Sequence, residues 1–278
     1  MWLRRQRRQA DAHRALEDEG LSEVRAAVRL NLLLLCAVMA ATPAYAGINP
    51  SRDVLWVALQ GCLLAKKATG RSFPCLAVDL GDKDLPGTAV LRAPGQPTHT
   101  VVMPTTAVVG VEAPQLQQSA GNSYWKAALA ARSYVMDALG GRLPIESVGL
   151  AVNSVGGRSQ DQLHIHLDCI KPAVRAALQR HSQRVRSTWS LFPVPLQGSR
   201  FFARRIEAAE VDTFNPFTAL MQLPGRATDL RSTSFAVISP QQPDAQKAFY
   251  LLAYRSPEAH AEMLLDHGCS AASKTATQ

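Results

Sequence analysis

His164 and His166 lie one residue apart in a run where apolar and polar residues alternate, Leu163-His164-Ile165-His166-Leu167-Asp168. Because successive side chains of a β-strand point to opposite faces, both imidazoles share one face of the expected strand. An imidazole near pH 7 can act as a nucleophile, carry a proton or bind a metal ion. Taken alone, the pair also fits surface histidines or hydrogen-bonded structural residues.

A polar turn precedes the pair. Asn153 lies thirteen residues before His166, Gln160 lies four before His164, and Gly156-Gly157 lies between them. Glycine lets backbone N–H groups approach an anion closely, and side-chain amides can donate to phosphate oxygens. Donors of this kind beside two imidazoles favour phosphoryl or nucleotidyl transfer.

Hydrophobic periodicity predicts the elements that hold these residues. Strands 147–153 and 163–168, joined by the glycine turn, should form an antiparallel hairpin that brings the loop and both imidazoles together. Further strands are expected over 88–92, 99–104, 233–239 and 248–254, and helices over 52–67, 122–139, 172–184, 216–223 and 257–265. This mixture predicts an α+β fold with a mostly antiparallel sheet and flanking helices.

The N-terminal part is typical of a targeting segment. Arg25 and Arg29 precede an apolar run, residues 30–41, which is followed by Pro43 and Ala44-Tyr45-Ala46. We expect residues 1–46 to be a tail with a signal peptide or signal anchor, and residues 47–278 to be a single catalytic domain. The protein is then exported, either to the inner membrane facing the periplasm or, if the signal is cleaved, to the periplasm.

Four cysteines follow the targeting segment, namely Cys62, Cys75, Cys169 and Cys269. An even number in an exported chain indicates two disulfides, and no Cys-x-x-Cys pair suggests a zinc site. Three pairings are possible. In one of them Cys62 and Cys75 close a short loop, and Cys169 and Cys269 tie the histidine strand to the C-terminus.

The formal net charge is +8, and about +6 remains once residues 1–46, with seven Arg and five acidic residues, are removed. This balance suits anionic partners such as phosphates or an anionic membrane surface. Nucleic acid is disfavoured, because the basic residues are scattered and lack interleaved aromatics. No oligomeric state is predicted.

The spacing Gln-x-x-x-His-φ-His-φ, with Asn153 before it and His99-Thr100-Val101-Val102-Met103-Pro104 far upstream, resembles the histidine triad (HIT) superfamily of nucleotide hydrolases and transferases. More specifically, the chain resembles the bacterial CDP-diacylglycerol pyrophosphatase family. The stretches that carry this resemblance are 150–154, 157–160, 164–166, 169–175, 203–205 and Asp266-His267-Gly268-Cys269.

The resemblance implies a HIT-like domain that hydrolyses CDP-diacylglycerol to CMP and phosphatidate without a metal or cofactor. His166 would attack the nucleotide's α-phosphate and form a covalent intermediate, and His164 would maintain the site's protonation and geometry. Asn153 and Gln160 would bind phosphate oxygens. The resemblance also makes Arg204 and Arg205 candidate phosphate partners.

One position departs from the superfamily pattern, because the third histidine is replaced by Asp168. An ionised carboxylate repels a phosphate oxygen. Asp168 could orient an imidazole, pair with an arginine or simply end the strand. We assign no catalytic role to His99, and we expect His181, His260 and His267 on the surface.

Two alternatives remain open at this point. The same chemistry could act on soluble nucleotide diphosphates. Alternatively, the chain could be a non-enzymatic periplasmic module that binds a metal through His164 and His166, with Asp168 as the local third ligand.

Overall fold

The computed structural model describes residues 49, 51–225, 229–240 and 248–275. Residues 50–278 form one compact unit. The expected tail and targeting segment, residues 1–46, lie outside the described residues. Among the helices that are described, none has the length and apolar character that a membrane crossing requires.

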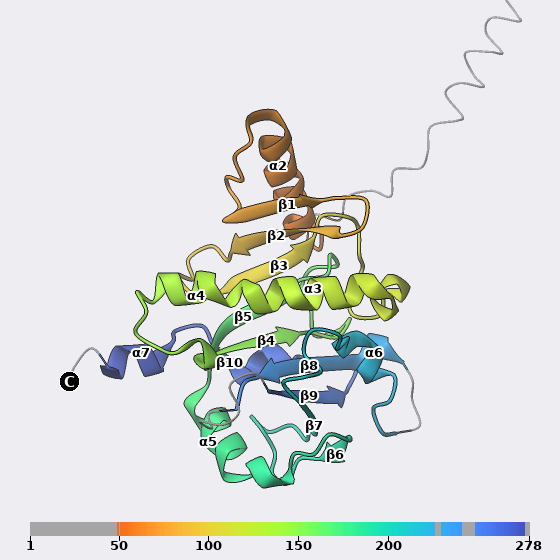
Figure 1. Ribbon diagram of the computed structural model, residues 1–278, viewed down its shortest axis with the longest axis vertical. Coiled ribbons are helices and arrows are strands. Elements are labelled where there is room, and N and C mark those ends of the chain that lie inside the picture. The colour runs from red at the N-terminus through yellow and green to blue at the C-terminus, as the bar shows by residue number, and fades with distance from the viewer. Residues whose placement is uncertain (1–48, 50, 226–228, 241–247, 276–278) are drawn as a thin grey trace, which may run out of the picture. The chain divides into compact units, whose positions relative to one another are not determined.

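A single antiparallel sheet organises the molecule (Figure 1). It has ten strands, nine of them in the order β1-β2-β3-β5-β4-β8-β9-β7-β6, while β10 pairs with the end of β5. The strands are β1 (Ala77–Gly81), β2 (Pro86–Arg92), β3 (Thr100–Pro104), β4 (Val148–Val152), β5 (Ile165–Ile170), β6 (Ser190–Leu191), β7 (Phe202–Ile206), β8 (Thr233–Ile238), β9 (Phe249–Arg255) and β10 (Leu265–Asp266). The expectation of an α+β fold with a mostly antiparallel sheet is confirmed.

The helices lie around this sheet. The α-helices are α2 (Val54–Thr69), α3 (Ser119–Ala130), α4 (Arg132–Ala138), α5 (Pro172–Arg180), α6 (Pro216–Leu220) and α7 (Ser270–Thr275). Short 3₁₀ turns are η1 (Pro114–Gln117), η2 (Ile145–Ser147), η3 (Ser182–Arg184), η4 (Leu230–Ser232) and η5 (Ala261–Leu264). The predicted helix over 257–265 is wrong, since this segment contains only η5 and the start of β10.

The expected hairpin of β4 and β5 is confirmed. The two strands pair antiparallel, with Ala151 opposite His166 and Leu150 opposite Leu167. The period of two along β5 places His166 and Leu167 on opposite faces of the sheet. Leu167 packs in the large core on the side of α3, α4 and α6, so the imidazole of His166 lies on the other side.

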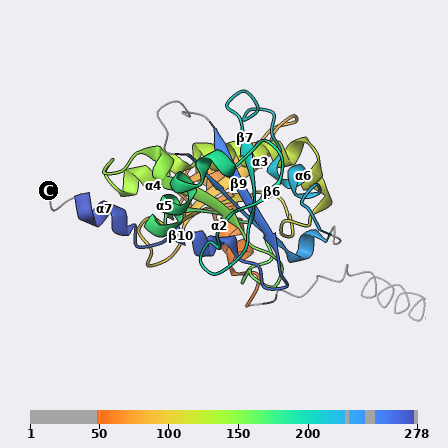
Figure 2. The same cartoon turned by 90° about the horizontal axis from the view of Figure 1, so that it is seen from below.

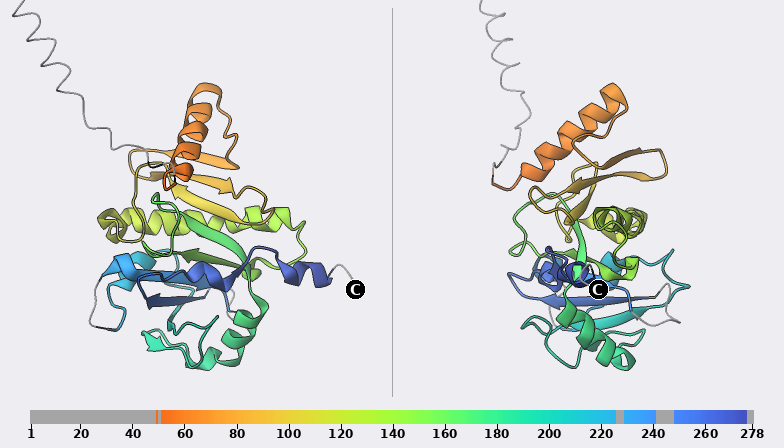
Figure 3. Two further views of the ribbon diagram at one scale, coloured as in Figure 1. Left: turned by 180° about the vertical axis from the view of Figure 1, so that it is seen from behind. Right: turned by 90° about the vertical axis from the view of Figure 1, so that its left-hand side faces the viewer.

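Two hydrophobic clusters share that other side. One joins α2 to β1–β3 and includes Leu59, Val101 and Met103. The second joins α5 and η5 to β4, β8 and β9 and includes Ala151 and Leu264. Figure 2, the view from below, and the right-hand view of Figure 3 show α3 on the opposite side of the sheet from α2.

Two disulfides, Cys62–Cys75 and Cys169–Cys269, connect distant segments. This confirms the expectation of two bonds and selects one of the three possible pairings. The first joins α2 to the segment before β1. The second joins β5 to the residue just before α7, so it holds the C-terminal segment against the histidine strand.

A candidate active site of four histidines and two carboxylates

His166 lies at the boundary between the two clusters on its side of the sheet. Its neighbours across the strands are Val101 of β3 and Ala151 of β4. Val101 belongs to the α2 cluster and Ala151 to the α5 and η5 cluster. Both neighbours are apolar and His166 is itself buried, so the imidazole is held by packing on either side.

His99, just before β3, is the nearest partner of His166. Its Nε2 lies 2.9 Å from Nδ1 of His166, and its Nδ1 lies 2.7 Å from Oε1 of Gln96. Because the Gln96 oxygen can only accept, His99 carries its proton on Nδ1, and its Nε2 accepts from the Nδ1–H of His166. This assignment leaves Nε2 of His166 unprotonated, with a lone pair that faces Nδ2 of Asn153.

The lone pair of His166 is available at neutral pH. Burial is the main reason why the pKa of His166 lies well below its ordinary value, and the neighbouring His164 lowers it further. Burial also lowers the pKa of His99, to about 4. A neutral imidazole with an unprotonated Nε2 is a competent nucleophile. Nδ2 of Asn153 lies 3.4 Å from this nitrogen, so an amide donor stands beside the reactive atom.

Glu262, in η5, connects three of these residues. Its Oε1 lies 3.2 Å from Nδ1 of His166 and 3.1 Å from Nε2 of His267, and its Oε2 accepts from Nδ2 of Asn153 at 2.8 Å. Burial alone would raise the pKa of Glu262, but the hydrogen bonds from His267 and Asn153 outweigh it and bring the pKa far below its ordinary value. Glu262 is therefore an anion beside the nucleophile.

His267 is the cation of the site. Its Nδ1 lies 2.8 Å from Oδ2 of Asp168, and its ring stacks on His99 with centroids 4.0 Å apart. Burial would lower the pKa of His267, but hydrogen bonds to Asp168 and Glu262 outweigh it and raise the pKa to about 9. Asp168 thus orients an imidazole, the first of the three roles considered for it, and the expectation that His267 is a surface residue is wrong.

His164 completes the cluster. Its Nδ1 donates to the carbonyl oxygen of Gln162 at 2.7 Å, and its ring meets that of His166 edge-on, with centroids 4.7 Å apart. Burial lowers the pKa of His164, although this hydrogen bond opposes the shift. The neutral ring therefore presents an unprotonated Nε2, which can take up a proton when an anion binds nearby.

A divalent metal would find ligands here as well. One donor atom from each of His99, His166 and Glu262 lies within 4.8 Å of the other two. The hydrogen bonds already account for these atoms without an ion, since the Nδ1–H of His166 lies between the nitrogen of His99 and the oxygen of Glu262. We considered Asp168 as a third metal ligand beside His164 and His166. In the structure its side chain instead contacts Nδ1 of His267.

Gln160 is not placed among the imidazoles. Its Oε1 accepts from the backbone N–H of Leu55, and its Nε2 donates to the carbonyl oxygens of Ser51 and Ser159. These contacts satisfy an otherwise free N–H at the start of α2. The side chain that we expected to bind phosphate therefore anchors a helix.

Arg204 and Arg205 lie far from the histidines, on β7, which is four strand positions from β5. Adjacent strands are separated by about 4.8 Å, so roughly 19 Å separate the two strands. Arg204 stacks over the ring of Phe214 on the face opposite His166, and Arg205 forms an ion pair with Glu207 at 2.8 Å. The structure therefore does not bring the two arginines, which we expected to bind the substrate's phosphates, together with the histidines.

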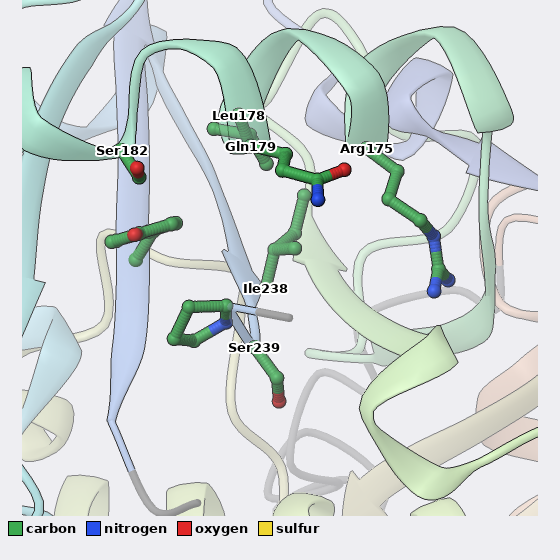
Figure 4. Close-up of a pocket in the computed structure, with 8 residues that line it drawn as sticks. Arg175, Leu178, Gln179, Ser182, Ile238 and Ser239 are labelled. Atoms are coloured by element: carbon green, nitrogen blue, oxygen red, sulfur yellow. The ribbon is translucent and has the colours of Figure 1, made fainter. Parts of the chain in front are cut away.

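A pocket between α5 and β8 is a separate feature (Figure 4). Its lining includes Arg175, Ser182 and Ser239, and none of the site histidines contributes to it. The guanidinium of Arg175 donates to the hydroxyl and carbonyl oxygens of Ser147, so it is engaged in hydrogen bonds within the protein.

Comparison with known proteins decides which family this site belongs to. The model of the CDP-diacylglycerol pyrophosphatase family matches residues 50–273. The chain belongs to the CDP-diacylglycerol pyrophosphatase family. The expected resemblance to this family is thus confirmed.

Curated relatives agree with the family model. The chain is 32% identical over 244 residues to a CDP-diacylglycerol pyrophosphatase of Yersinia pestis, a match that covers 85% of this chain and 92% of the relative. It is also 32% identical to a probable CDP-diacylglycerol pyrophosphatase of Mycobacterium leprae, over 83% of this chain and 86% of the relative. The alignments cover nearly the whole of each relative, so the likeness extends beyond the histidine strand.

Sequence reasoning missed three residues of the site, His99, Glu262 and His267. The helix expected over 257–265 gave no reason to place Glu262, or His267 just beyond its end, beside the histidine strand. The segment instead contains η5 and leads into β10, which pairs with β5. A signal was present, however. His267 lies two residues before Cys269, and the Cys169–Cys269 disulfide forces it close to β5.

Proposed function

We propose that this CDP-diacylglycerol pyrophosphatase family member hydrolyses the diphosphate of CDP-diacylglycerol, with His166 as a covalent nucleophile in a HIT-like site. The observation that carries the proposal is the unprotonated Nε2 of His166, a neutral imidazole whose Nδ1–H faces His99 and Glu262. The names of the relatives indicate the substrate. The contacts of His166 support its role as the nucleophile.

In the first step, Nε2 of His166 attacks the phosphorus attached to cytidine, and the P–O bond to phosphatidate breaks. Phosphatidate leaves with the bridging oxygen, and CMP remains on the ring as a phosphoramidate. In the second step, water attacks the same phosphorus, the P–N bond breaks, and CMP leaves. One water is consumed in total, and its proton passes to the solvent.

The charges around His166 suit both steps. The ring becomes cationic when its Nε2 bonds to phosphorus, and Oε1 of Glu262, 3.2 Å from Nδ1, stabilises that charge. His267 carries a positive charge toward the anionic phosphates. Asp168 and Glu262 hold that charge in place through Nδ1 and Nε2. His267 therefore supplies the imidazole that this chain lacks at position 168, where the superfamily pattern has a histidine.

We also propose that the enzyme works outside the cytoplasm, on a membrane surface. Two disulfides support an oxidising compartment, and the apolar run at residues 30–41 with Ala44-Tyr45-Ala46 supports export. A diacylglycerol substrate requires access to a bilayer, and the formal net charge of +8 suits an anionic lipid surface.

The test is an assay of purified protein with CDP-diacylglycerol labelled in the cytidine. The proposal expects equal amounts of CMP and phosphatidate, with no release by His166→Ala. A water-soluble CDP-alcohol is added in competition. If the soluble compound is cleaved and the lipid is not, the substrate assignment is wrong while the chemistry stands.

A further inference from the structure

α2 carries an apolar stripe on the side that faces away from the sheet. Its buried residues are Leu59, Cys62 and Leu63. The stripe consists of Val54, Val57, Gly61 and Leu64, at spacings of three and four residues. Residues with this spacing share one face of a helix. Val54, Val57 and Leu64 are 57%, 50% and 70% exposed.

The loop after α2 extends this apolar surface. Phe73 is 80% exposed, the highest value among the exposed large hydrophobic residues, and Leu76 is 39% exposed. The Cys62–Cys75 disulfide joins the buried face of α2 to the loop two residues beyond Phe73. This bond limits how far the loop can move from α2. We call residues 70–76 the Phe73 loop.

The segment that carries this surface is positively charged. From Val54 to Val78 the sequence contains Lys66, Lys67 and Arg71 and no Asp or Glu. Lys67 and Arg71 are exposed and Lys66 is partly exposed. Apolar side chains flanked by basic residues on one helix are the pattern of elements that lie in the interface of an anionic bilayer.

The N-terminal end of the surface lies against the segment that leads into the histidine strand. The N-terminus of α2 is tied to the segment before β5 by the Arg52–Asp161 ion pair at 2.6 Å and by the hydrogen bond from Leu55 to Gln160. The buried side of α2 packs in the same cluster as Val101, the strand neighbour of His166. A 16-residue helix is about 24 Å long, so α2 reaches from the histidine-bearing segment to the Phe73 loop.

We infer that the stripe of α2 and the Phe73 loop form the surface by which the enzyme docks on an anionic lipid bilayer, with the N-terminal end of α2 against the segment that leads to His166. This inference rests on the proposed function and specifies where the membrane is met. A lipid-linked diphosphate could then reach Nε2 of His166 while its acyl chains stay in the bilayer. The positive charges of Lys66, Lys67 and Arg71 face lipid phosphates.

The test compares one enzyme on two forms of the substrate. Wild type, Leu64→Asp/Phe73→Asp and the control Leu191→Asp are assayed with long-chain CDP-diacylglycerol in vesicles and with a short-chain, monodisperse CDP-diacylglycerol. The vesicles contain phosphatidylcholine with or without phosphatidylglycerol. Leu191 is a matched control because it is 45% exposed on β6, at the other end of the strand order from β1.

We expect the double variant to lose about tenfold or more in kcat/KM on the anionic vesicles, because two apolar side chains no longer enter the lipid. On the monodisperse substrate, and in the Leu191→Asp variant on both substrates, the activity should stay within about twofold. Lys66→Gln/Lys67→Gln/Arg71→Gln should abolish the preference for phosphatidylglycerol. An equal loss on both substrates, or no loss on vesicles, overturns the docking surface.

Two other outcomes are distinguishable. If wild type cleaves neither form of the substrate, the proposed function fails. Docking is then tested separately, by measuring whether brominated lipids quench the tryptophan fluorescence of a Phe73→Trp variant. Quenching in anionic vesicles supports the docking surface, and its absence overturns it. If sedimentation shows a wild-type dimer that dissociates in Leu64→Asp/Phe73→Asp, the stripe binds a second copy of the chain and the inference is wrong.

Discussion

Oδ2 of Asp168 lies 2.8 Å from Nδ1 of His267, although 99 positions separate the two residues in the sequence. Asp168 occupies the strand position where the HIT-like pattern that we propose would have a third histidine. Through this contact an imidazole still reaches the site, from the C-terminal segment instead of from β5. The Cys169–Cys269 disulfide holds the two segments together directly beside the contact.

The first prediction concerns the imidazolium of His267. Asp168→Asn removes the anion that helps to keep His267 protonated, so the pKa of His267 should fall from about 9. At pH 8 we expect kcat to fall by roughly tenfold to a hundredfold, with a smaller effect at pH 6, where His267 is protonated in either protein. Steady-state kinetics at the two pH values measure this. An equal loss at both would show that Asp168 acts in some other way.

The pH profile of the wild-type enzyme follows from the same groups. His267 must be protonated, so kcat/KM should fall as the pH rises through about 9. His166 must be neutral. Because its pKa lies well below the ordinary value, the imidazole stays neutral at pH 6. The profile should therefore stay flat between about pH 6 and pH 8. An alkaline limb near pH 7 would contradict the assignment of His267.

Stability should depend on His267 in a defined pH window. Its pKa is raised in the folded state, from 6.5 to about 9, so the stabilisation is complete below pH 6.5 and is lost as the pH rises through 9. The contribution of His267 to the free energy of unfolding should decrease by up to about 3 kcal/mol across this range. Urea unfolding of wild type and His267→Gln at pH 6 and 9.5 tests this: the difference between the two proteins should shrink by that amount, because His99, His164 and His166, whose pKa values are lowered, affect both proteins alike.

The two disulfides should differ in their effect on activity. Cys169→Ala/Cys269→Ala frees the segment that carries His267, and Cys62→Ala/Cys75→Ala frees only the Phe73 loop. The chain-entropy model gives a loss of stability of about 4.7 kcal/mol for a loop of 100 residues and about 3 kcal/mol for the shorter one. On a monodisperse substrate, only the first variant should lose kcat, by about tenfold or more. Equal kcat values in folded samples of both would contradict this role of the Cys169–Cys269 bond.

Arg204 and Gln160 provide a further comparison, because the sequence suggested phosphate binding for both and the structure places neither there. Arg204→Gln should keep KM and kcat within about twofold of wild type. Gln160→Ala should lower the free energy of unfolding by about 1 kcal/mol, because a backbone N–H of α2 loses its acceptor. A large rise in KM for Arg204→Gln would show that the arginine reaches the substrate.

The sequence was sufficient for the parts of the site that are local in the chain. A period of two set the face of His164 and His166, and the glycine turn set the β4–β5 hairpin and brought Asn153 near His166. These features depend on neighbours within about twenty residues. The net charge and the number of cysteines, which are counted over the whole chain, indicated an anionic substrate and two disulfides.

The parts that failed depend on contacts between distant segments. Glu262 and His267 reach the site only because the chain after β9 turns back across β4 and β5, and apolar spacing in 257–265 imitates a helix. The misassignment of Arg204 arose in a different way, because a short basic motif shows neither the strand order nor the face of the sheet. Its position on β7 follows from the pairing of β7 with β9.

The central claim is that His166 forms a covalent bond to the nucleotide, and trapping of the adduct by an alkaline quench tests it most directly. Enzyme is mixed briefly with CDP-diacylglycerol labelled in the cytidine, denatured at alkaline pH and digested, and the labelled peptide is mapped. We predict an acid-labile CMP adduct on Nε2 of His166, present in wild type and in His260→Ala and absent in His166→Ala. A label on another residue, or rapid turnover by folded His166→Ala protein, would contradict the account.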